Sequence, residues 1–231
     1  MSSKIAIMGA MAEEIEPLLE QVEDIKKIEY AKNIYYEATY RGREVVIAYS
    51  KIGKVFASLT ATILIEKFGC NRLLFSGVAG AINPELKIGD LIIASDLCQH
   101  DLDITAFGHP YGYVPEGEVC IPTDKRLREI AKEVAKDRGL ELKEGTIATG
   151  DQFISCKDRK AFISSTFNAD ALEMEGGSVA VICDALKVPF FILRAISDSA
   201  DGSADIDFDR FLESSAKISA DFILDMVDKI E

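Results

Sequence analysis

Residues 171–198 read ALEMEGGSVAVICDALKVPFFILRAISD, and this stretch decides the fold. The apolar runs Ala171–Met174 and Phe190–Ile196 have the length of buried strands, and the segment Gly177–Leu186 between them is typical of a helix. A helix that connects two strands favours parallel pairing, because the chain must cross back over the sheet. The stretch therefore predicts a β-α-β unit and an α/β fold.

The rest of the chain continues this alternation without a Pro- or Ser-rich linker. Further strands are expected at Lys4–Ala10, Ile34–Tyr40, Glu44–Ser50, Leu73–Ser76, Leu91–Leu97 and Thr146–Gly150. Further helices are expected at residues 11–22, Lys54–Phe68, Asp124–Arg138 and Phe208–Ile230. We expect one domain over residues 1–231, with three α/β/α layers around a central mixed, mostly parallel twisted sheet.

The composition is acidic: the 231 residues are 48% hydrophobic and 28% charged, and the net charge is −13. Such a surface repels nucleic acid and anionic membranes, and it favours a neutral or cationic small molecule. No apolar run is long enough to span a membrane, and acidic residues follow the start too soon for a signal peptide. We expect a cytoplasmic protein that binds neither nucleic acid nor membrane.

Cysteine and histidine give little indication of metal chemistry. The five cysteines, at positions 70, 98, 120, 156 and 183, form no CxxC pair, and we interpret them as small buried apolar side chains. The string from His100 to Asp103 lacks the spacing of a metal motif, and we interpret it as a solvated loop. Because neither a dinucleotide fingerprint nor a P-loop occurs, we expect no metal and no cofactor.

Two segments indicate contacts beyond the core. Residues 100–123 contain aromatic residues, proline and glycine with little periodicity, and a loop of this length is usually functional or lies at an interface. The segment Val55–Phe68 is apolar or small on nearly all sides. A buried core helix and a dimer face are both compatible with that composition.

Carboxylates follow four of the expected strands. They are Glu14, Asp151, Glu175 and Asp198, and open α/β sheets bind ligands at the carboxyl ends of their strands. A single carboxylate there is often only a helix cap, but several at one edge indicate an acidic pocket. Burial raises a carboxyl pKa, so one aspartic acid of such a pocket can keep its proton near neutral pH and act as an acid.

At these residues the sequence closely resembles the 5′-methylthioadenosine/S-adenosylhomocysteine nucleosidases of the nucleoside phosphorylase superfamily. The resemblance runs in register over nearly the whole chain and implies the fold of that superfamily. The matching stretches are IMGAMAEEIEPL (7–18), SKIGKV (50–55), SGVAGAI (76–82), LKIGD (86–90), HDLDITAFGHPYG (100–112), ATGDQFI (148–154), LEMEGGSVA (172–180), RAISDSAD (194–201) and FDRFL (208–212).

The resemblance implies an enzyme that hydrolyses the N-glycosidic bond of adenine nucleosides. 5′-Methylthioadenosine, S-adenosylhomocysteine and 5′-deoxyadenosine share adenine and differ in the 5′ group. Related enzymes of some bacteria also accept 6-amino-6-deoxyfutalosine, on the route to menaquinone, and the sequence does not exclude this nucleoside as the main substrate.

The resemblance also implies catalytic roles. Asp198 would protonate adenine N7, Glu14 would activate water, and Glu175 would hold the ribose hydroxyls. Arg194 and Ser197 would position Asp198, the water and the acidic cluster.

Other positions would form the walls of the pocket. Phe153 would stack on the purine, and the Ile154 backbone would read its edge. The further substrate-binding positions implied are Met11, Ile52, Val78, Ala79, Gly80, Glu173, Met174 and Phe208. Ile104, Phe107 and Pro115 would close the pocket of the partner subunit in a homodimer. One residue departs from the family, because Val78 stands where some members have a hydroxyl near the water.

The residue types suit the chemistry. Cleavage of a ribosyl C–N bond builds positive charge on the sugar and negative charge on the leaving base. An acid that protonates the base is worth about 10²–10⁴ in rate, and carboxylates near the sugar favour the developing cation. In glycoside hydrolysis, likewise, one carboxyl donates a proton and another serves the incoming water.

Two alternatives stay open. A phosphorylase of the same superfamily would need cationic or amide donors for phosphate, whereas the first strand is followed by Glu13 and Glu14 and by no Arg or Lys before Lys26. A nucleoside-binding module without catalysis would use the carboxylates only as helix caps.

Overall fold

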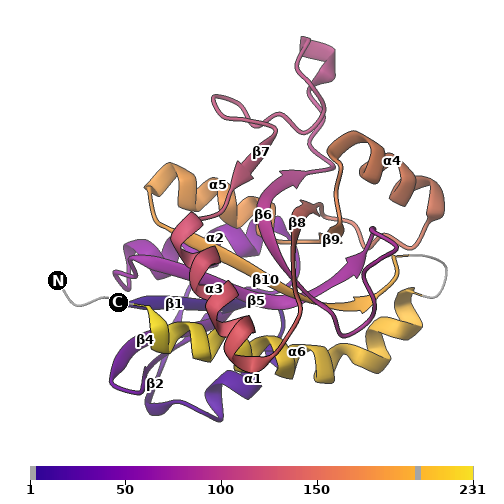
Figure 1. The fold of residues 1–231 in the computed structure, drawn as a ribbon. Helices are drawn as coiled ribbons and strands as arrows, with labels where there is room; N and C mark the ends of the chain where they lie inside the picture. Colours follow the sequence, from indigo (N-terminus) through magenta and orange to yellow (C-terminus); the bar gives the residue numbers. More distant parts are fainter. Residues whose placement is uncertain (1–3, 201–203, 231) are drawn as a thin grey trace.

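The computed structural model describes residues 4–200 and 204–230 (Figure 1). Its strands are β1 (Ile5–Gly9), β2 (Glu23–Tyr30), β3 (Asn33–Tyr40), β4 (Arg43–Tyr49), β5 (Arg72–Ala81), β6 (Leu91–Gln99), β7 (Cys120–Pro122), β8 (Leu142–Thr149), β9 (Ala171–Glu173) and β10 (Phe190–Asp198). Its helices are α1 (Ala12–Leu19), α2 (Lys54–Glu66), α3 (Lys125–Arg138), α4 (Lys157–Phe167), α5 (Gly176–Leu186) and α6 (Ala204–Lys229), with a 3₁₀ turn at Thr105–Phe107.

One mixed sheet takes up the ten strands of the described residues. Strand β5 pairs in parallel with β1 and β10 and antiparallel with β9. Strand β10 also pairs antiparallel with β6, and β6, β8 and β9 follow in parallel, so that five strands close on themselves. The predicted class, an α/β fold with a mixed sheet, is confirmed. The expected parallel β-α-β unit over residues 171–198 is wrong, because β5 pairs in parallel with β10 but antiparallel with β9, so that β9 and β10 run in opposite directions. The closure brings the ends of β9 and β10 next to β5, which places their acidic residues together.

Helices cover both sheet faces, because the strand side chains alternate between two cores. In β1, Ile5 and Ile7 belong to the core under α1, α3 and α6, whereas Ala6 and Met8 belong to the core under α2 and α5. Such alternation follows from the period of two residues in a strand. The predicted α/β/α layers are thus present, with α4 over a smaller cluster beside β8.

A helix begins and ends where the sequence predicts when clear capping residues are present at both ends. Helix α3 begins after Asp124, whose carboxylate accepts a hydrogen bond from the Leu127 N–H at 2.8 Å. It ends at Gly139, whose φ of 64° lies in the left-handed region that glycine adopts without strain. The predicted helix at Asp124–Arg138 is confirmed, and the strands expected at Ile34–Tyr40 and Glu44–Ser50 are present as β3 and β4, which pair antiparallel as a hairpin.

Three predictions about elements need correction. Strand β5 continues to Ala81, past its predicted end at Ser76, because the small residues 77–81 pair with β10 and β9. Strand β2 was not expected, since seven of its eight residues are exposed and therefore show no apolar alternation. Helix α4 was not expected either, because it buries only Ile163 and Phe167.

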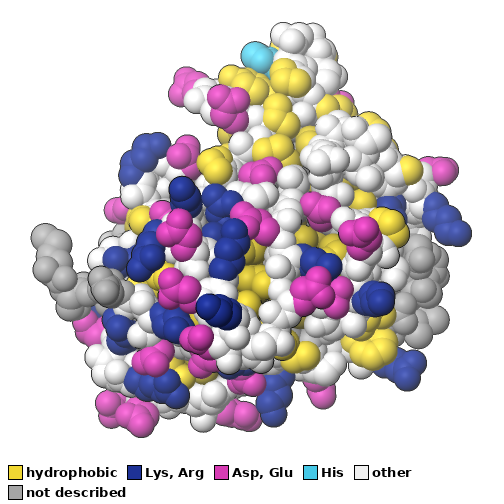
Figure 2. Space-filling view, viewed as in Figure 1, with side chains coloured by type: hydrophobic (Ala, Val, Ile, Leu, Met, Phe, Trp, Pro, Cys, Tyr) yellow, Lys and Arg dark blue, Asp and Glu magenta, His cyan; other side chains and the backbone are white. Residues whose placement is uncertain are grey.

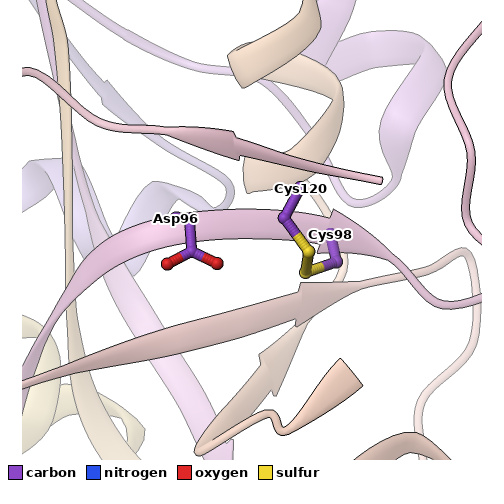
Figure 3. A group of neighbouring side chains, drawn as sticks. All are labelled: Asp96, Cys98 and Cys120. Atoms are coloured by element: carbon purple, nitrogen blue, oxygen red, sulfur yellow. A yellow bond between two sulfur atoms is a disulfide. The ribbon is translucent and has the colours of Figure 1, made fainter. Parts of the chain in front are cut away.

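The interpretation of all cysteines as small buried side chains is wrong. Cys70 and Cys183 are free and buried, but Cys156 is exposed, and Cys98 is bonded to Cys120. The two bonded residues face each other on the antiparallel strands β6 and β7, with 4.3 Å between their Cα atoms (Figure 3). The sequence did not reveal this bond, because the two paired strands are separated by a long segment.

Asp96 lies beside this disulfide and forms with it the one group of metal-ligand type in the described residues (Figure 3). The two sulfur atoms are bonded to each other and therefore offer no thiolates. The Asp96 carboxylate accepts hydrogen bonds from the hydroxyls of Ser95 and Thr146, at 2.6 and 3.1 Å. The residues present thus do not fit a bound metal ion.

The interpretation of His100–Asp103 as a solvated loop is also wrong for His100, which is fully buried. Its N–H donates to the Thr149 carbonyl at 2.8 Å, so the chain still follows β8 at this point. The imidazole fills the space beside Gly150, where a Cβ atom would lie only 2.3 Å from the ring. The segment between β6 and β7 projects from the body of the molecule (Figure 1).

The visible surface mixes charges of both signs, and hydrophobic side chains gather on the projecting segment (Figure 2). Among the described residues, no helix has both the length and the apolar composition needed to cross a membrane.

Candidate active site

A cavity of about 280 Å³ opens at the carboxyl ends of β1, β5, β9 and β10. It is lined by Ala10, Met11, Glu14, Ile52, Val78, Ala79, Gly80, Gln152, Phe153, Ile154, Leu172, Glu173, Met174, Glu175, Ser197, Asp198 and Phe208. Three of the four predicted carboxylates, Glu14, Glu175 and Asp198, therefore face one cavity, and each is almost fully buried. Among the described lining residues, none is Lys or Arg.

Glu14 is held by backbone N–H groups from the turn after β1 and from β5. It occupies the third position of α1, where its Oε2 accepts hydrogen bonds from the N–H of Ala10 at 2.5 Å and of Met11 at 3.1 Å. Its Oε1 accepts from the Val78 N–H at 3.1 Å. Glycine is required at position 77, because a Cβ atom there would lie 2.8 Å from Oε1. Burial raises the pKa of Glu14 against the opposing effect of Arg194 and these N–H groups, which suits a group that accepts a proton.

Arg194 lies behind the cavity wall rather than in it, and it neutralises the acidic cluster. Its guanidinium Nη2 donates to Glu173 Oε2 at 2.7 Å in an ion pair that is almost fully buried. The same oxygen accepts from the N–H groups of Glu175 and Gly176, and the Thr149 hydroxyl donates to the other oxygen. Glu173 therefore lines the cavity, but protein donors occupy both of its oxygens and leave it as the anchor of α5.

Glu175 precedes α5 and faces the cavity from the opposite side. Its Oε1 accepts a hydrogen bond from the Gly53 N–H at 2.8 Å. Burial, together with the nearby Glu173 charge, raises the pKa of Glu175 to about 8. The side chain can therefore change its charge in response to what enters the cavity.

Asp198 ends β10, where the pairing with β5 is irregular between Ile196 and Asp198. Such an irregularity redirects the side chains that follow it. The Ser197 hydroxyl donates to Asp198 Oδ2 at 3.0 Å, and the Ala200 N–H donates to Oδ1 at 2.8 Å. Glycine at position 80 leaves room for this carboxyl, because a Cβ atom there would lie 2.7 Å from Oδ1.

Apolar side chains complete the cavity. Phe153 packs edge-on against Phe208, with ring centroids 5.7 Å apart, and both lie across from the backbone of Val78–Gly80. Ile52 is 56% exposed at the rim. A mostly apolar lining with a few convergent polar groups is typical of a site that binds a small molecule.

Some predicted residues lie elsewhere. Ile104, Phe107 and Pro115 sit on the segment between β6 and β7, outside the cavity of their own chain. Asp151 is exposed and accepts a hydrogen bond from the Lys54 N–H at 2.8 Å, so the fourth carboxylate is a helix cap. The lining residues that the sequence did not indicate are Ala10, Gln152 and Leu172. Each is adjacent in the sequence to a predicted site residue, and this adjacency is the signal by which they could have been found.

Comparison with known proteins agrees with this site. Residues 4–228 match the family model of the phosphorylase superfamily, and the chain belongs to this superfamily. Within it, the aminodeoxyfutalosine nucleosidase of Campylobacter jejuni is 60% identical over 98% of this chain and 99% of that protein. The resemblance stated from the sequence motifs is thereby confirmed at the level of the family.

Solved structures give the same result. The futalosine hydrolase of Helicobacter pylori strain 26695 has a TM-score of 0.97 and 49% identity, over 100% of this chain and 99% of that one. The Helicobacter pylori 5′-methylthioadenosine/S-adenosylhomocysteine nucleosidase, solved with butyl-thio-DADMe-Immucillin-A, has a TM-score of 0.97 and 48% identity over 100% of both chains.

The raised pKa of Glu175 predicts a pH-dependent stability. Its value of about 8 exceeds the ordinary 4.5, so the stability that the neutral carboxyl gives is complete below pH 4.5 and lost as the pH rises through 8. Glu175→Gln stays neutral throughout. We expect its free energy of unfolding, relative to the wild type, to increase between pH 5 and pH 9, by ~1.4 kcal/mol per unit of pKa shift. Urea unfolding at several pH values measures this, and a constant difference would contradict it.

Proposed function

We propose that this protein hydrolyses the N-glycosidic bond of small adenine nucleosides and releases adenine. The observation that carries the proposal is the meeting of Glu14, Glu175 and Asp198 around one cavity with an aromatic wall. Nucleosidases named for such substrates are similar to this chain over its whole length.

Asp198 is the proposed acid at adenine N7. Its two oxygens have different partners, the Ser197 hydroxyl and the Ala200 N–H, and these fix the orientation of the carboxyl toward the cavity. Phe153 would stack on the purine, and the Ile154 backbone would meet its edge. A fixed acid next to a stacked base needs no rearrangement when the C–N bond breaks.

Glu14 is the proposed base for water. Its raised pKa favours proton uptake, and three backbone N–H groups keep its position fixed. Val78 offers its N–H to Glu14 but no hydroxyl to the water. We infer that the carboxylate orients the water without help from this position, and that Arg194 acts through Glu173 and its charge.

Glu175 is the proposed ribose ligand, beside Met174. A carboxyl with a pKa of about 8 is poised between its two charge states near neutral pH. Positive charge that develops on the ribose favours the ionised state, and the ionised state in turn favours that charge. The interaction therefore strengthens as the bond breaks, which is the requirement for catalysis.

Water is the proposed nucleophile rather than phosphate. The described lining residues bring no positive side chain into the cavity. Buried carboxylates would repel a phosphate ion at short range. A phosphorolytic enzyme of the same fold is the second candidate, and a binding module without catalysis is the third.

Among the nucleosides, 6-amino-6-deoxyfutalosine is the proposed physiological substrate, in menaquinone biosynthesis. Relatives named for it are 60% and 49% identical to this chain. Relatives named for methylthioadenosine and adenosylhomocysteine range from 37–39% identity to solved structures of 48% and 60% identity, so both kinds of nucleoside stay within the proposal. The exposed Ile52 at the rim leaves space for a large 5′ group.

The purified protein should release adenine from 6-amino-6-deoxyfutalosine, 5′-methylthioadenosine, S-adenosylhomocysteine and 5′-deoxyadenosine at rates that do not change when phosphate is removed. Adenine release is measured by chromatography, with and without phosphate. Turnover that requires phosphate or arsenate would identify a phosphorylase, and no release from any of the four would leave only a binding module.

The variant Asp198→Asn should lower kcat by about 10²–10⁴, because the amide keeps the shape of the side chain but has no acidic proton. Thermal unfolding and calorimetric binding of an uncleavable nucleoside analogue serve as controls and should change little. Undiminished turnover in this variant would show that another group protonates the base.

We also propose that the protein forms a homodimer through α2 and the projecting segment. Helix α2 buries Ala57 and Leu64, whereas Val55 on its other side is 76% exposed. Phe107 on the projecting segment is 81% exposed. Large apolar side chains that are exposed in this way are typical of an interface. In such a dimer, Ile104, Phe107 and Pro115 would close the partner's cavity. One side of α2 thus packs against the core, and in this proposal its other side packs against the partner subunit.

A charge on that face should separate the subunits. We expect Leu59→Arg to sediment as a monomer and to lose affinity for nucleosides with a 5′ substituent, because the partner's residues would leave the rim of the cavity. Ile218→Arg, on α6, is the matched control, since this residue is also exposed and apolar. A wild-type protein that sediments as a monomer at assay concentration would refute the dimer.

We further propose that residues 1–231 form one nucleosidase domain in the cytoplasm, without nucleic acid or membrane partners. One sheet takes strands from Ile5 to Asp198, and the net charge of −13 disfavours polyanionic partners. The free thiols of Cys70, Cys156 and Cys183 suit a reducing compartment. The Cys98–Cys120 bond is the observation that argues against it.

A further inference from the structure

A partly buried ionic contact lies just outside the cavity. Asp101 follows β6, and its Oδ1 lies 2.6 Å from the ammonium of Lys54 in an ion pair whose side chains are 15% and 19% exposed. Its other oxygen, Oδ2, accepts a hydrogen bond from the Asp151 N–H at 2.8 Å. One carboxylate therefore joins the start of α2 to the segment after β8.

Its two partners are bonded to each other, and the residues that follow or precede them in the chain belong to the cavity or are bonded to it. The Lys54 N–H donates to Asp151 Oδ1 at 2.8 Å, which closes a triangle with Asp101. Gly53, the residue before Lys54, donates its N–H to Glu175. Asp151 lies two residues before Phe153, which forms the aromatic wall. The triangle thus connects directly to the ribose side and to the adenine side of the cavity.

We propose that Asp101 is a positioning residue, which sets the place of Glu175 through Lys54 and Gly53 and the place of Phe153 through Asp151. This inference rests on the proposed nucleosidase function, because it assigns the consequence to nucleoside binding. Nothing in the cavity contacts Asp101 itself, so its effect reaches the substrate only through these two segments.

The negative charge of Asp101 is needed, and not only its shape. Burial tends to raise the pKa of its carboxyl, but the Lys54 ammonium and the Asp151 N–H outweigh this effect and hold the pKa below its ordinary value. Without the charge, the ammonium is left with neutral acceptors, such as the Gln99 side-chain oxygen at 3.2 Å, in place of a carboxylate. A half-buried cation that loses its carboxylate moves toward water and draws the start of α2 with it.

The groups proposed for proton transfer do not depend on this triangle. Glu14 is held by N–H groups of its own turn and of β5, and Asp198 is held by Ser197 and Ala200. Loss of the Asp101 charge should therefore leave the proposed acid and base in place. It should weaken nucleoside binding through Phe153 and slow the chemical step only as far as Glu175 is displaced. A larger effect on KM than on kcat distinguishes positioning of the substrate from a general loss of structure, which would lower kcat as well.

The test compares Asp101→Asn with Asp103→Asn in the full-length protein. Asp103 lies two residues further along and is exposed, and its carboxylate accepts hydrogen bonds from the N–H and the hydroxyl of Thr105. With 5′-methylthioadenosine, we expect Asp101→Asn to raise KM about tenfold and to change kcat less than about threefold, as for a lost binding contribution. Asp103→Asn should match the wild type in both.

A second variant keeps the test decisive. Lys54→Met should raise KM to a similar extent, and the double variant should be no worse than either single one, because both remove the same contact. Equal KM values for Asp101→Asn and Asp103→Asn, additive effects in the double variant, or a fall in kcat at unchanged KM would each overturn the inference while the nucleosidase function stands. A wild-type protein that releases no adenine would instead remove the proposed function, and the inference with it.

Discussion

The buried Arg194 guanidinium is the constraint on which the acidic site depends. Glu14, Glu173 and Glu175 all lie at one edge of the sheet, and their mutual repulsion at low dielectric would be costly without a cation among them. Arg194 is bonded to Glu173 and lowers the pKa of both other carboxyls against the effect of burial. Because Glu173 also anchors α5, this single ion pair joins the electrostatics of the cavity to the packing of β9, α5 and β10.

The closed arrangement of strands makes room for that cluster. Strand β5 passes through the centre, and its glycines at positions 77 and 80 stand opposite Glu14 and Asp198, where any side chain would collide with a carboxyl oxygen. The irregular end of β10 then turns Asp198 toward the same space. The buried carboxyl groups therefore need glycine opposite them, and a larger residue at position 77 or 80 would displace Glu14 or Asp198.

Much of this could be read from the sequence, because apolar runs mark buried strands and the acids follow directly on them. Glu14, Glu175 and Asp198 were found in that way, and so was the mixed α/β class. What stayed hidden depends on partners far along the chain. The Cys98–Cys120 pair, the burial of His100 beside Gly150 and the contact of Asp101 with Lys54 join segments that no local pattern relates. Strand β2, with almost no buried side chain, left no periodic signal at all.

The contacts of the site divide into two kinds, and the division fits a family with varied substrates. Glu14 and Asp198 are fixed by neighbouring backbone and by the strand ends themselves, so the proposed base and acid cannot shift independently of the sheet. Glu175 and Phe153 lie on segments tied together by side chains from elsewhere. Binding surfaces held by a few long-range contacts can change from one relative to the next without moving the acid and the base. The same sheet edge can thus keep its chemistry while the nucleoside named for each relative differs.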